Sequence, residues 1–278
     1  MRGLLAEQFA DLADLDLVEL ASGWDNAIFR LGHDLTVRLP RRALSAELVE
    51  HEQRWLPALA ERLPLPIPVP LRFGRPSFGY PWRWSVCPWF AGDPATRVPP
   101  DDAISSAATL GAFVGALNQP APRDAPANPY RGIPLAHRTE RLHSSLDALG
   151  TTIDGSSVRA LWSDLVNTPP WVAPPVWLHG DLHPGNVLVH DGQIAAVIDF
   201  GDLTAGDPAT DLAVAWMLFP PEARPRFRAA AGGCDDDTWA RARGWALALG
   251  VAYIAGSADK PEFTDLGQQV VASALGDD

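Results

Sequence analysis

Apolar and polar residues follow different patterns on the two sides of residue 90. Before it, short apolar runs alternate with turns, and a single segment has helical spacing. Beyond it, apolar residues mostly recur three and four positions apart, as in amphipathic helices. We therefore predict an α+β protein with two lobes: residues 1–88 with an antiparallel sheet and one helix, and a mainly helical part, residues 89–278.

The N-terminal part contains a predicted β-hairpin followed by a helix. Runs at 27–31 and 35–39 are strand-like, and Gly32 begins the turn between them. The segment 45–62 has helical periodicity, and Ser45 is its predicted N-cap.

Two proline-containing stretches follow this helix. "LPLPIPVP" (63–70) predicts an extended connector, because proline breaks helices. "YPWRWSVCPWF" (80–90) is strand-like and ends at Pro88.

The remaining chain is predicted to be largely helical. A helix should begin at Asp101 or Asp102 and reach residue 118, and the proline-rich stretch 118–134 should be a loop. Further helices are expected near 136–149, 156–167, 209–219, 222–231, 237–256 and 262–275.

Residues 176–198 interrupt this pattern with short β-type runs around a polar loop. "VWL" precedes the loop "HGDLHPG", and "NVLV" and "IAAVI" flank the hairpin turn at Asp191 and Gly192. This topology predicts that Asp181 from the loop, Asn186 at the start of the hairpin and Asp199 at its exit converge.

Three converging oxygen-bearing side chains suit Mg²⁺, which prefers oxygen ligands. Alternatively, Asp181 faces a substrate hydroxyl as a base, which is the division of roles that phosphoryl transfer requires. Each residue alone also suits a turn or a cap. Together, the three favour a phosphoryl-transfer site.

A zinc site is the competing interpretation of the same loop. His179, Asp181 and His183 form an H-x-D-x-H array of ligand-type residues. No further cluster of histidines or cysteines follows it, which disfavours a metallohydrolase.

The composition of the chain limits the classes of molecule that it is expected to bind. The formal net charge of −12 disfavours nucleic acid and suits a cationic ligand. No apolar run approaches the roughly 18–20 residues of a membrane span. The N-terminus lacks the pattern of a secretory signal, and Cys87 and Cys234 are far apart, so we expect a protein of the reducing cytoplasm.

The motif "HGDLHPGNVLV…VIDFGD" resembles the catalytic signature of the aminoglycoside phosphotransferase family, which are small-molecule kinases with a protein-kinase-like fold. The resemblance implies that Asp181 is the catalytic base, that Asn186 and Asp199 hold Mg²⁺, and that His179 braces the loop. Asp207 and Asp211 correspond to the segment that starts the next helix, and we interpret both as helix caps.

The same resemblance places the nucleotide in the N-terminal lobe. Arg38 stands where the family usually has a lysine that pairs phosphate with a helix glutamate, and "RLPRR" is similar to the corresponding stretch of macrolide kinases. Glu52 is the predicted partner, with Glu47 and Glu50 as alternatives. An arginine can still bridge phosphate and carboxylate.

Further contacts are expected along the nucleotide and on the acceptor side. Ser22, Asp25 and Asn26 lie where the phosphate-covering hairpin sits, although a plain turn is an equal interpretation. Pro88 lacks an N–H, so Cys87 or Trp89 should donate to the base. We place Asp202 and Trp216 on the acceptor side.

The sequence therefore predicts an ATP- or GTP-dependent O-phosphotransferase acting on a small molecule. An aminoglycoside-type antibiotic is favoured because acidic surface attracts polycations. The alternatives are a macrolide, an amino-alcohol or sugar metabolite, and a nucleotide-binding module without catalysis. A protein kinase is disfavoured, since no segment resembles one that docks a peptide.

Overall fold

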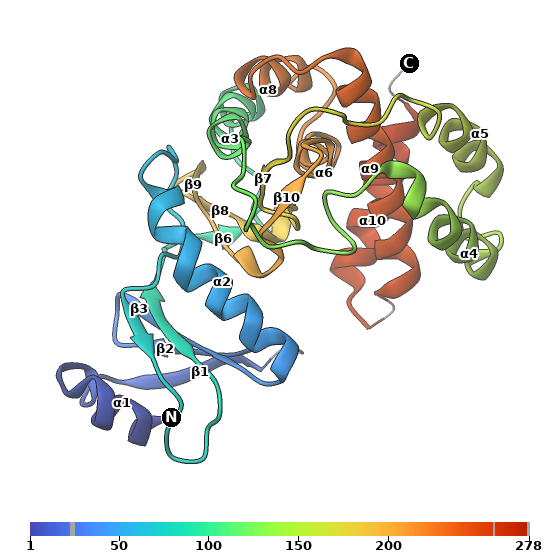
Figure 1. The fold of residues 1–278 in the computed structure, drawn as a ribbon. Helices are drawn as coiled ribbons and strands as arrows, with labels where there is room; N and C mark the ends of the chain where they lie inside the picture. The colour runs from blue at the N-terminus through green and yellow to red at the C-terminus, as the bar shows by residue number, and fades with distance from the viewer. Residues whose placement is uncertain (23–25, 258, 277–278) are drawn as a thin grey trace.

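In the computed structural model, which describes residues 1–22, 26–257 and 259–276, the N-terminal lobe is built on a five-stranded antiparallel sheet in the order β1-β2-β3-β5-β4 (Figure 1). The strands are β1 (Leu17–Ser22), β2 (Asn26–Leu31), β3 (Leu35–Pro40), β4 (Arg72–Gly74) and β5 (Trp84–Pro88). The predicted hairpin is confirmed, with Leu31 opposite Leu35 across its turn.

Two α-helices accompany this sheet, where the sequence predicted one. The long helix α2 (Ala43–Ala60) agrees with the prediction, but its N-cap is Arg42 and Ser45 is buried within it, so the predicted cap was wrong. The additional helix α1 (Arg2–Gln8) has seven residues, too few for a clear periodic signal, and it buries Leu4 and Leu5. A 3-10 turn, η1 (Ala10–Leu12), follows it.

The C-terminal lobe is mainly helical, as predicted. Its elements are α3 (Ala103–Leu117), η2 (Leu135–Arg138), α4 (Thr139–Leu149), α5 (Gly155–Leu165), α6 (Ala209–Leu212), α7 (Val214–Leu218), α8 (Arg224–Ala230), α9 (Asp236–Gly256) and α10 (Pro261–Leu275). Asp102 caps α3 by accepting the backbone N–H groups of Ile104 and Ser105. The segment predicted as one helix over 209–219 forms two, which meet at Ala213.

Short strands lie between the helices and the N-terminal lobe. They are β6 (Asp93–Pro94), β7 (Val176–Leu178), β8 (Val187–His190), β9 (Gln193–Val197) and β10 (Thr204–Gly206). The predicted hairpin β8–β9 turns at Asp191 and Gly192, both with positive φ, as its tight turn requires. The hairpin lies in the region between the two lobes (Figure 1).

Among the described residues, buried apolar side chains form two clusters. The smaller one contains Leu31, Val37 and Trp84 of the sheet together with Leu4 and Leu5 of α1. The larger one fills the C-terminal lobe and also takes in two residues near the end of α2. The long helix thus joins the two lobes.

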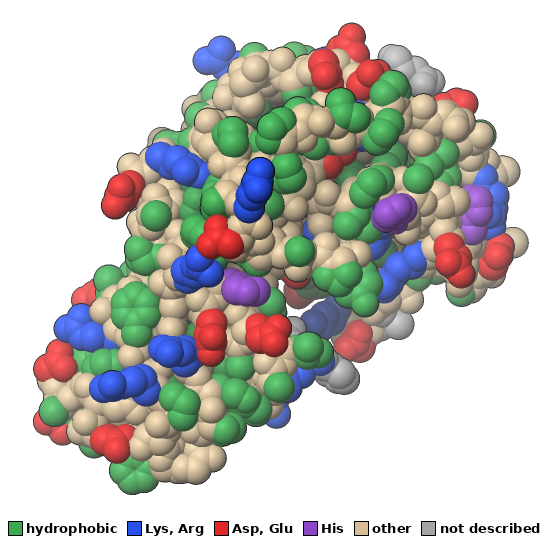
Figure 2. All heavy atoms as spheres, in the orientation of Figure 1, with side chains coloured by type: hydrophobic (Ala, Val, Ile, Leu, Met, Phe, Trp, Pro, Cys, Tyr) green, Lys and Arg blue, Asp and Glu red, His purple; other side chains and the backbone are tan. Residues whose placement is uncertain are grey.

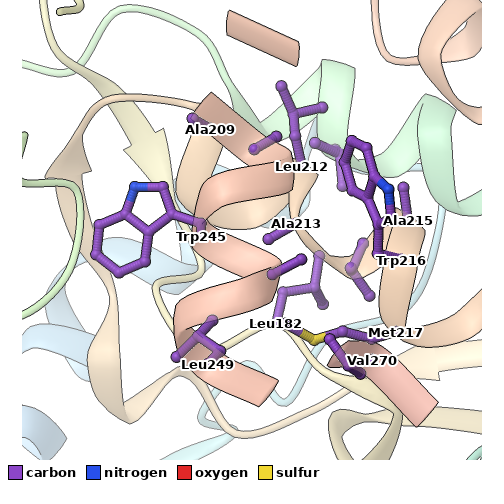
Figure 3. Packing of buried hydrophobic residues seen from close by; sticks show 14 of the residues in the cluster. Leu182, Ala209, Leu212, Ala213, Ala215, Trp216, Met217, Trp245, Leu249 and Val270 are labelled. Carbon is purple, nitrogen blue, oxygen red and sulfur yellow. The ribbon is translucent and has the colours of Figure 1, made fainter. Parts of the chain in front are cut away.

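The larger cluster includes Trp216, which corrects the prediction that this residue faces an acceptor. Figure 3 shows Trp216 among buried apolar residues of α6, α7, α9 and α10. Its side chain is only 3% exposed, and its ring centroid lies 4.5 Å from that of Trp239. Helix α7 is buried on almost every side, so its tryptophan supports the core. Within the described residues, no helix has the length and apolar character needed to cross a membrane.

Candidate active site

The loop between β7 and β8 is held from beneath by a buried carboxylate. Asp211 Oδ2 accepts the backbone N–H of His179 at 2.7 Å, and its Oδ1 accepts that of Gly180 at 3.0 Å. Gly180 has φ +86°, and a Cβ there would lie 2.2 Å from the carbonyl oxygen of Asp202. Asp211 therefore fixes the loop and does not cap a helix as predicted.

The imidazole of His179 is fully buried and bonds only to the backbone around it. Its Nδ1 accepts the N–H of Asp181 at 3.2 Å, which leaves Nε2 to donate to the carbonyl of Ile198 at 2.9 Å. With both ring nitrogens bonded to the backbone, His179 braces the loop and turns neither nitrogen toward a metal. Among the described residues, no cluster of three His, Cys, Asp or Glu side chains could hold a metal.

Asp181 lies on this braced loop between an arginine and a histidine. The Arg131 guanidinium lies 2.7 Å from Oδ1, and His183 Nε2 lies 3.5 Å from Oδ2. Burial by itself would raise the pKa of Asp181, but His183 and Arg131 together hold it well below its ordinary value. The side chain is therefore a fixed carboxylate that can accept a hydrogen bond from a hydroxyl.

Asn186 and Asp199 lie close together through the hairpin register. Asn186 accepts the N–H of Ile198, the neighbour of Asp199, at 2.9 Å. The Asn186 amide nitrogen donates to the carbonyl of Asp181 at 2.9 Å, so its side-chain oxygen is turned away from that bond. Asp199 binds Arg38 through Oδ1. Two side-chain oxygens of this kind fit a hard cation such as Mg²⁺.

Arg38 connects the sheet, helix α2 and the hairpin. One terminal nitrogen lies 2.8 Å from Glu52 Oε1, and the other lies 2.7 Å from Asp199 Oδ1. Burial opposes the charge of Arg38, but these two carboxylates raise its pKa above the ordinary value. The pKa of Glu52 is raised to about 7, because the effect of burial exceeds the opposing effect of the Arg38 charge.

The alternative partners of Arg38 lie elsewhere. Glu47 and Glu50 are exposed, and Glu50 pairs with Arg83 at 3.6 Å. With its amide oxygen turned toward Arg38, Asn26 accepts from the guanidinium at 3.2 Å.

A cavity of about 150 Å³ lies where these groups meet. Its lining residues come from both lobes and are Asn26, Arg38, Leu48, Asp181, Asp199, Gly201 and Asp202. The surface is hollowed between the lobes, with acidic side chains near the rim (Figure 2). A polar cavity with an arginine on one side and a carboxylate on the other can hold a phosphate chain against a hydroxyl.

The structure describes only some of the other residues that we predicted to contact the nucleotide. Asp25 and the side chain of Ser22 lie outside the described residues. The backbone N–H of Trp89 donates to the carbonyl of Asp34 at 2.8 Å, and its ring lies 3.8 Å from the Arg30 guanidinium carbon. The Trp89 N–H therefore already has a backbone acceptor just beyond the ends of β3 and β5, which argues against its assignment as a base donor. Cys87 stays a prediction.

The sequence did not predict the contacts made by Arg131 and Asn128. Asn128 donates to Asp202 Oδ1 at 2.7 Å, and Arg131 Nε lies 4.0 Å from Asp202 Oδ2. Both come from the proline-rich stretch 118–134, where no periodicity shows which way a side chain points.

Asp207 combines a backbone contact beside the start of α6, whose N-cap is Pro208, with an ion pair. It accepts the N–H of Ala209 at 3.0 Å at the start of α6 and pairs with the buried Arg241 at 2.7 Å.

The fold resembles solved phosphotransferases. The GDP complex of aminoglycoside 2'-phosphotransferase-IIIa matches with a TM-score of 0.72 and 20% identity, over 98% of this chain and 96% of that one. Its complex with GDP and kanamycin gives a TM-score of 0.71 at 20% identity, over 98% and 97%. Macrolide 2'-phosphotransferase MphH from Brachybacterium faecium gives 0.64 at 23% identity, over 99% and 96%. A search of curated proteins found no match.

A protein-kinase-like fold with this loop and hairpin at the junction of its lobes defines a small-molecule kinase. The family model of the phosphotransferase enzyme family matches residues 16–245, which include both lobes of the site. The chain belongs to that family.

Proposed function

We propose that this enzyme transfers the γ-phosphate of ATP or GTP to a hydroxyl group of a small molecule. One observation carries the proposal: Arg38, Asp199 and Asp181 line the same cavity, so phosphate and acceptor can meet there. The GDP complex of the aminoglycoside 2'-phosphotransferase supports a nucleotide as co-substrate.

Each residue has a definite task in this reaction. Arg38, oriented by Glu52, holds the nucleotide phosphates, and Asp181 orients the hydroxyl and accepts its proton. Asn186 and Asp199 would hold Mg²⁺, which neutralises phosphate charge when it is bound. Residues 1–88 would thus bind the nucleotide, and residues 89–278 would supply catalysis and the acceptor site.

The first acceptor to test is an aminoglycoside, because the net charge of −12 favours a polycation. A macrolide is the second candidate on a separate observation. The Phe263 ring lies 5.6 Å from that of His183, and the Tyr253 ring lies 6.0 Å from it. These aromatic rings beside Asp181 offer apolar surface to a less charged acceptor.

The test is incubation of the purified protein with Mg²⁺, ATP or GTP, and kanamycin, streptomycin or erythromycin. Mass spectrometry should show one acceptor gaining a phosphate while the nucleoside diphosphate appears. Nucleotide binding without turnover, with any acceptor or with water, would instead identify a catalytically silent binding module.

A further inference from the structure

A short segment of the proline-rich loop, residues 126–132, is anchored to the floor of the site; we call it the strap. At one end, the carbonyl of Pro126 accepts from the Thr204 hydroxyl at 3.0 Å and from the Ala205 N–H at 3.2 Å. At the other end, the Gly132 N–H donates to the Thr210 hydroxyl at 3.1 Å. The strap is thus tied to β10 and α6.

Two glycines let the strap lie directly on β10. Gly132 has φ +67°, a conformation that favours glycine. A Cβ on Gly206 would lie 2.2 Å from the carbonyl oxygen of Gly132. The backbones therefore touch, and the side chains of the strap are held at fixed positions.

Two of those side chains reach the acceptor side of the site. Arg131 binds Asp181 Oδ1 at 2.7 Å, and Asn128 binds Asp202 Oδ1 at 2.7 Å. The Arg131 side chain is 17% exposed, and its Nε has no hydrogen-bond partner among the described residues. A long side chain kept in this buried position orders the carboxylate that it contacts.

We propose that Arg131 is a positioning residue for phosphoryl transfer. The strap holds its guanidinium on Oδ1 of Asp181, so that the acceptor hydroxyl meets Oδ2, the oxygen that also faces His183 Nε2 at 3.5 Å. This inference rests on the proposed function. The hydroxyl oxygen forms the new bond to phosphorus while its proton passes to Oδ2. The bond between phosphorus and the bridging oxygen breaks, and its electron pair leaves with the nucleoside diphosphate.

The test compares Arg131→Gln and Arg131→Lys with wild type, using kanamycin, erythromycin and water as acceptors of phosphate from ATP or GTP. A misplaced catalytic group costs about 10²-fold in rate, so Arg131→Gln should lose on the order of 10- to 100-fold in kcat. Its nucleotide Kd, measured by calorimetry, should stay within about twofold of wild type. Arg131→Lys should recover part of the rate, because an ammonium group still pairs with Oδ1.

Arg159→Gln is the matched control, because it also breaks an arginine–aspartate pair. Arg159 on α5 lies 2.6 Å from Asp147 on α4. It should keep the wild-type kcat. An unchanged kcat in folded Arg131→Gln, or equal losses of kcat and nucleotide affinity, would overturn the inference alone. If Arg131→Gln fails to fold, Arg131→Lys decides by the same criteria. A wild-type protein with no turnover, even with water, would overturn the proposed function as well.

Discussion

The buried carboxylate of Asp211 accepts the backbone N–H of His179 at 2.7 Å. This bond ties the start of the helical segment after the hairpin to the loop that carries Asp181. The carboxylate of Asp211 also accepts the N–H of Gly180. Asp211, 30 positions further along the chain, thus sets the geometry of the proposed base Asp181.

Asp211→Asn should weaken this support while preserving shape. The amide keeps a single acceptor oxygen, so one buried backbone N–H loses its partner, which costs about 1–3 kcal/mol. We expect the free energy of unfolding to fall by that amount in urea denaturation, and kcat to fall with it. Asp164→Asn, on the exposed side of α5, serves as the control and should change stability by less than about 0.5 kcal/mol.

The ion pair between Asp207 and Arg241 should contribute to stability, because both side chains are only 4% exposed. Asp207→Asn would leave a buried arginine without its counter-charge, which typically costs about 3–5 kcal/mol. Asp236→Asn provides the comparison: Asp236 pairs with Arg228 at 2.6 Å but is 96% exposed. That exposed pair should be worth about 0–1 kcal/mol. Equal losses in the two variants would contradict the assignment.

Local patterns accounted for the framework of this site. The Asp191–Gly192 turn fixed the hairpin register, and the register carries Asn186 and Asp199 to the same end of the hairpin. The pairing of Arg38 with Glu52, in contrast, was expected from the family resemblance and not from local patterns.

Tertiary contacts decided what the sequence could not. A polar residue at the start of an apolar helix suggests a cap, and only packing shows that Asp211 binds a distant loop instead. Arg131 lies in a loop without periodicity, so nothing in the chain points to its pairing with Asp181. Trp216, which we expected on the acceptor side, belongs to the core, because only its packing shows that the helix carrying it is buried.

Glu52 should make stability depend on pH. Its pKa rises from 4.5 to about 7 in the folded protein, chiefly through burial. Between these values the folded state keeps a proton that the unfolded chain releases. The free energy of unfolding should therefore fall as pH rises through this window, by about 1 kcal/mol per pH unit, and level off above it.

Glu52→Gln removes this titration. Denaturant unfolding of both proteins across the window should show the stability of wild type declining relative to the variant as pH rises. Parallel profiles would mean that Glu52 ionises normally in the fold.

Arg38 should govern nucleotide use. Arg38→Ala removes charged hydrogen bonds worth about 1.5–3 kcal/mol each, so kcat/KM for the nucleotide should fall by about 10- to 100-fold. Arg38→Lys should retain part of the activity, although one ammonium group cannot match the fork that reaches both Glu52 and Asp199. Steady-state kinetics with varied ATP and GTP provide the measurement, and wild-type kinetics in Arg38→Ala would remove Arg38 from the phosphate site.

Asp181 and Asp199 should fail in different ways. As the group that receives the acceptor proton, Asp181 contributes about 10²–10⁴-fold to the rate. Asp181→Asn keeps its shape and loses its charge, so transfer should fall by that factor while nucleotide Kd stays near the wild-type value. Asp199→Ala removes a proposed Mg²⁺ ligand, so Mg²⁺-dependent nucleotide binding should fall together with the rate.

The measurement is kcat from a coupled ADP or GDP assay, beside nucleotide Kd from calorimetry with and without Mg²⁺. Asp191→Asn is the matched control, because its side chain is 91% exposed at the tip of the hairpin that carries Asp199. If Asp181→Asn retains most of its turnover, the carboxylate that Arg131 and His183 hold at 2.7 and 3.5 Å is not the base. If Asp199→Ala loses its rate while Mg²⁺-dependent nucleotide binding stays unchanged, Asp199 is not a ligand of the metal.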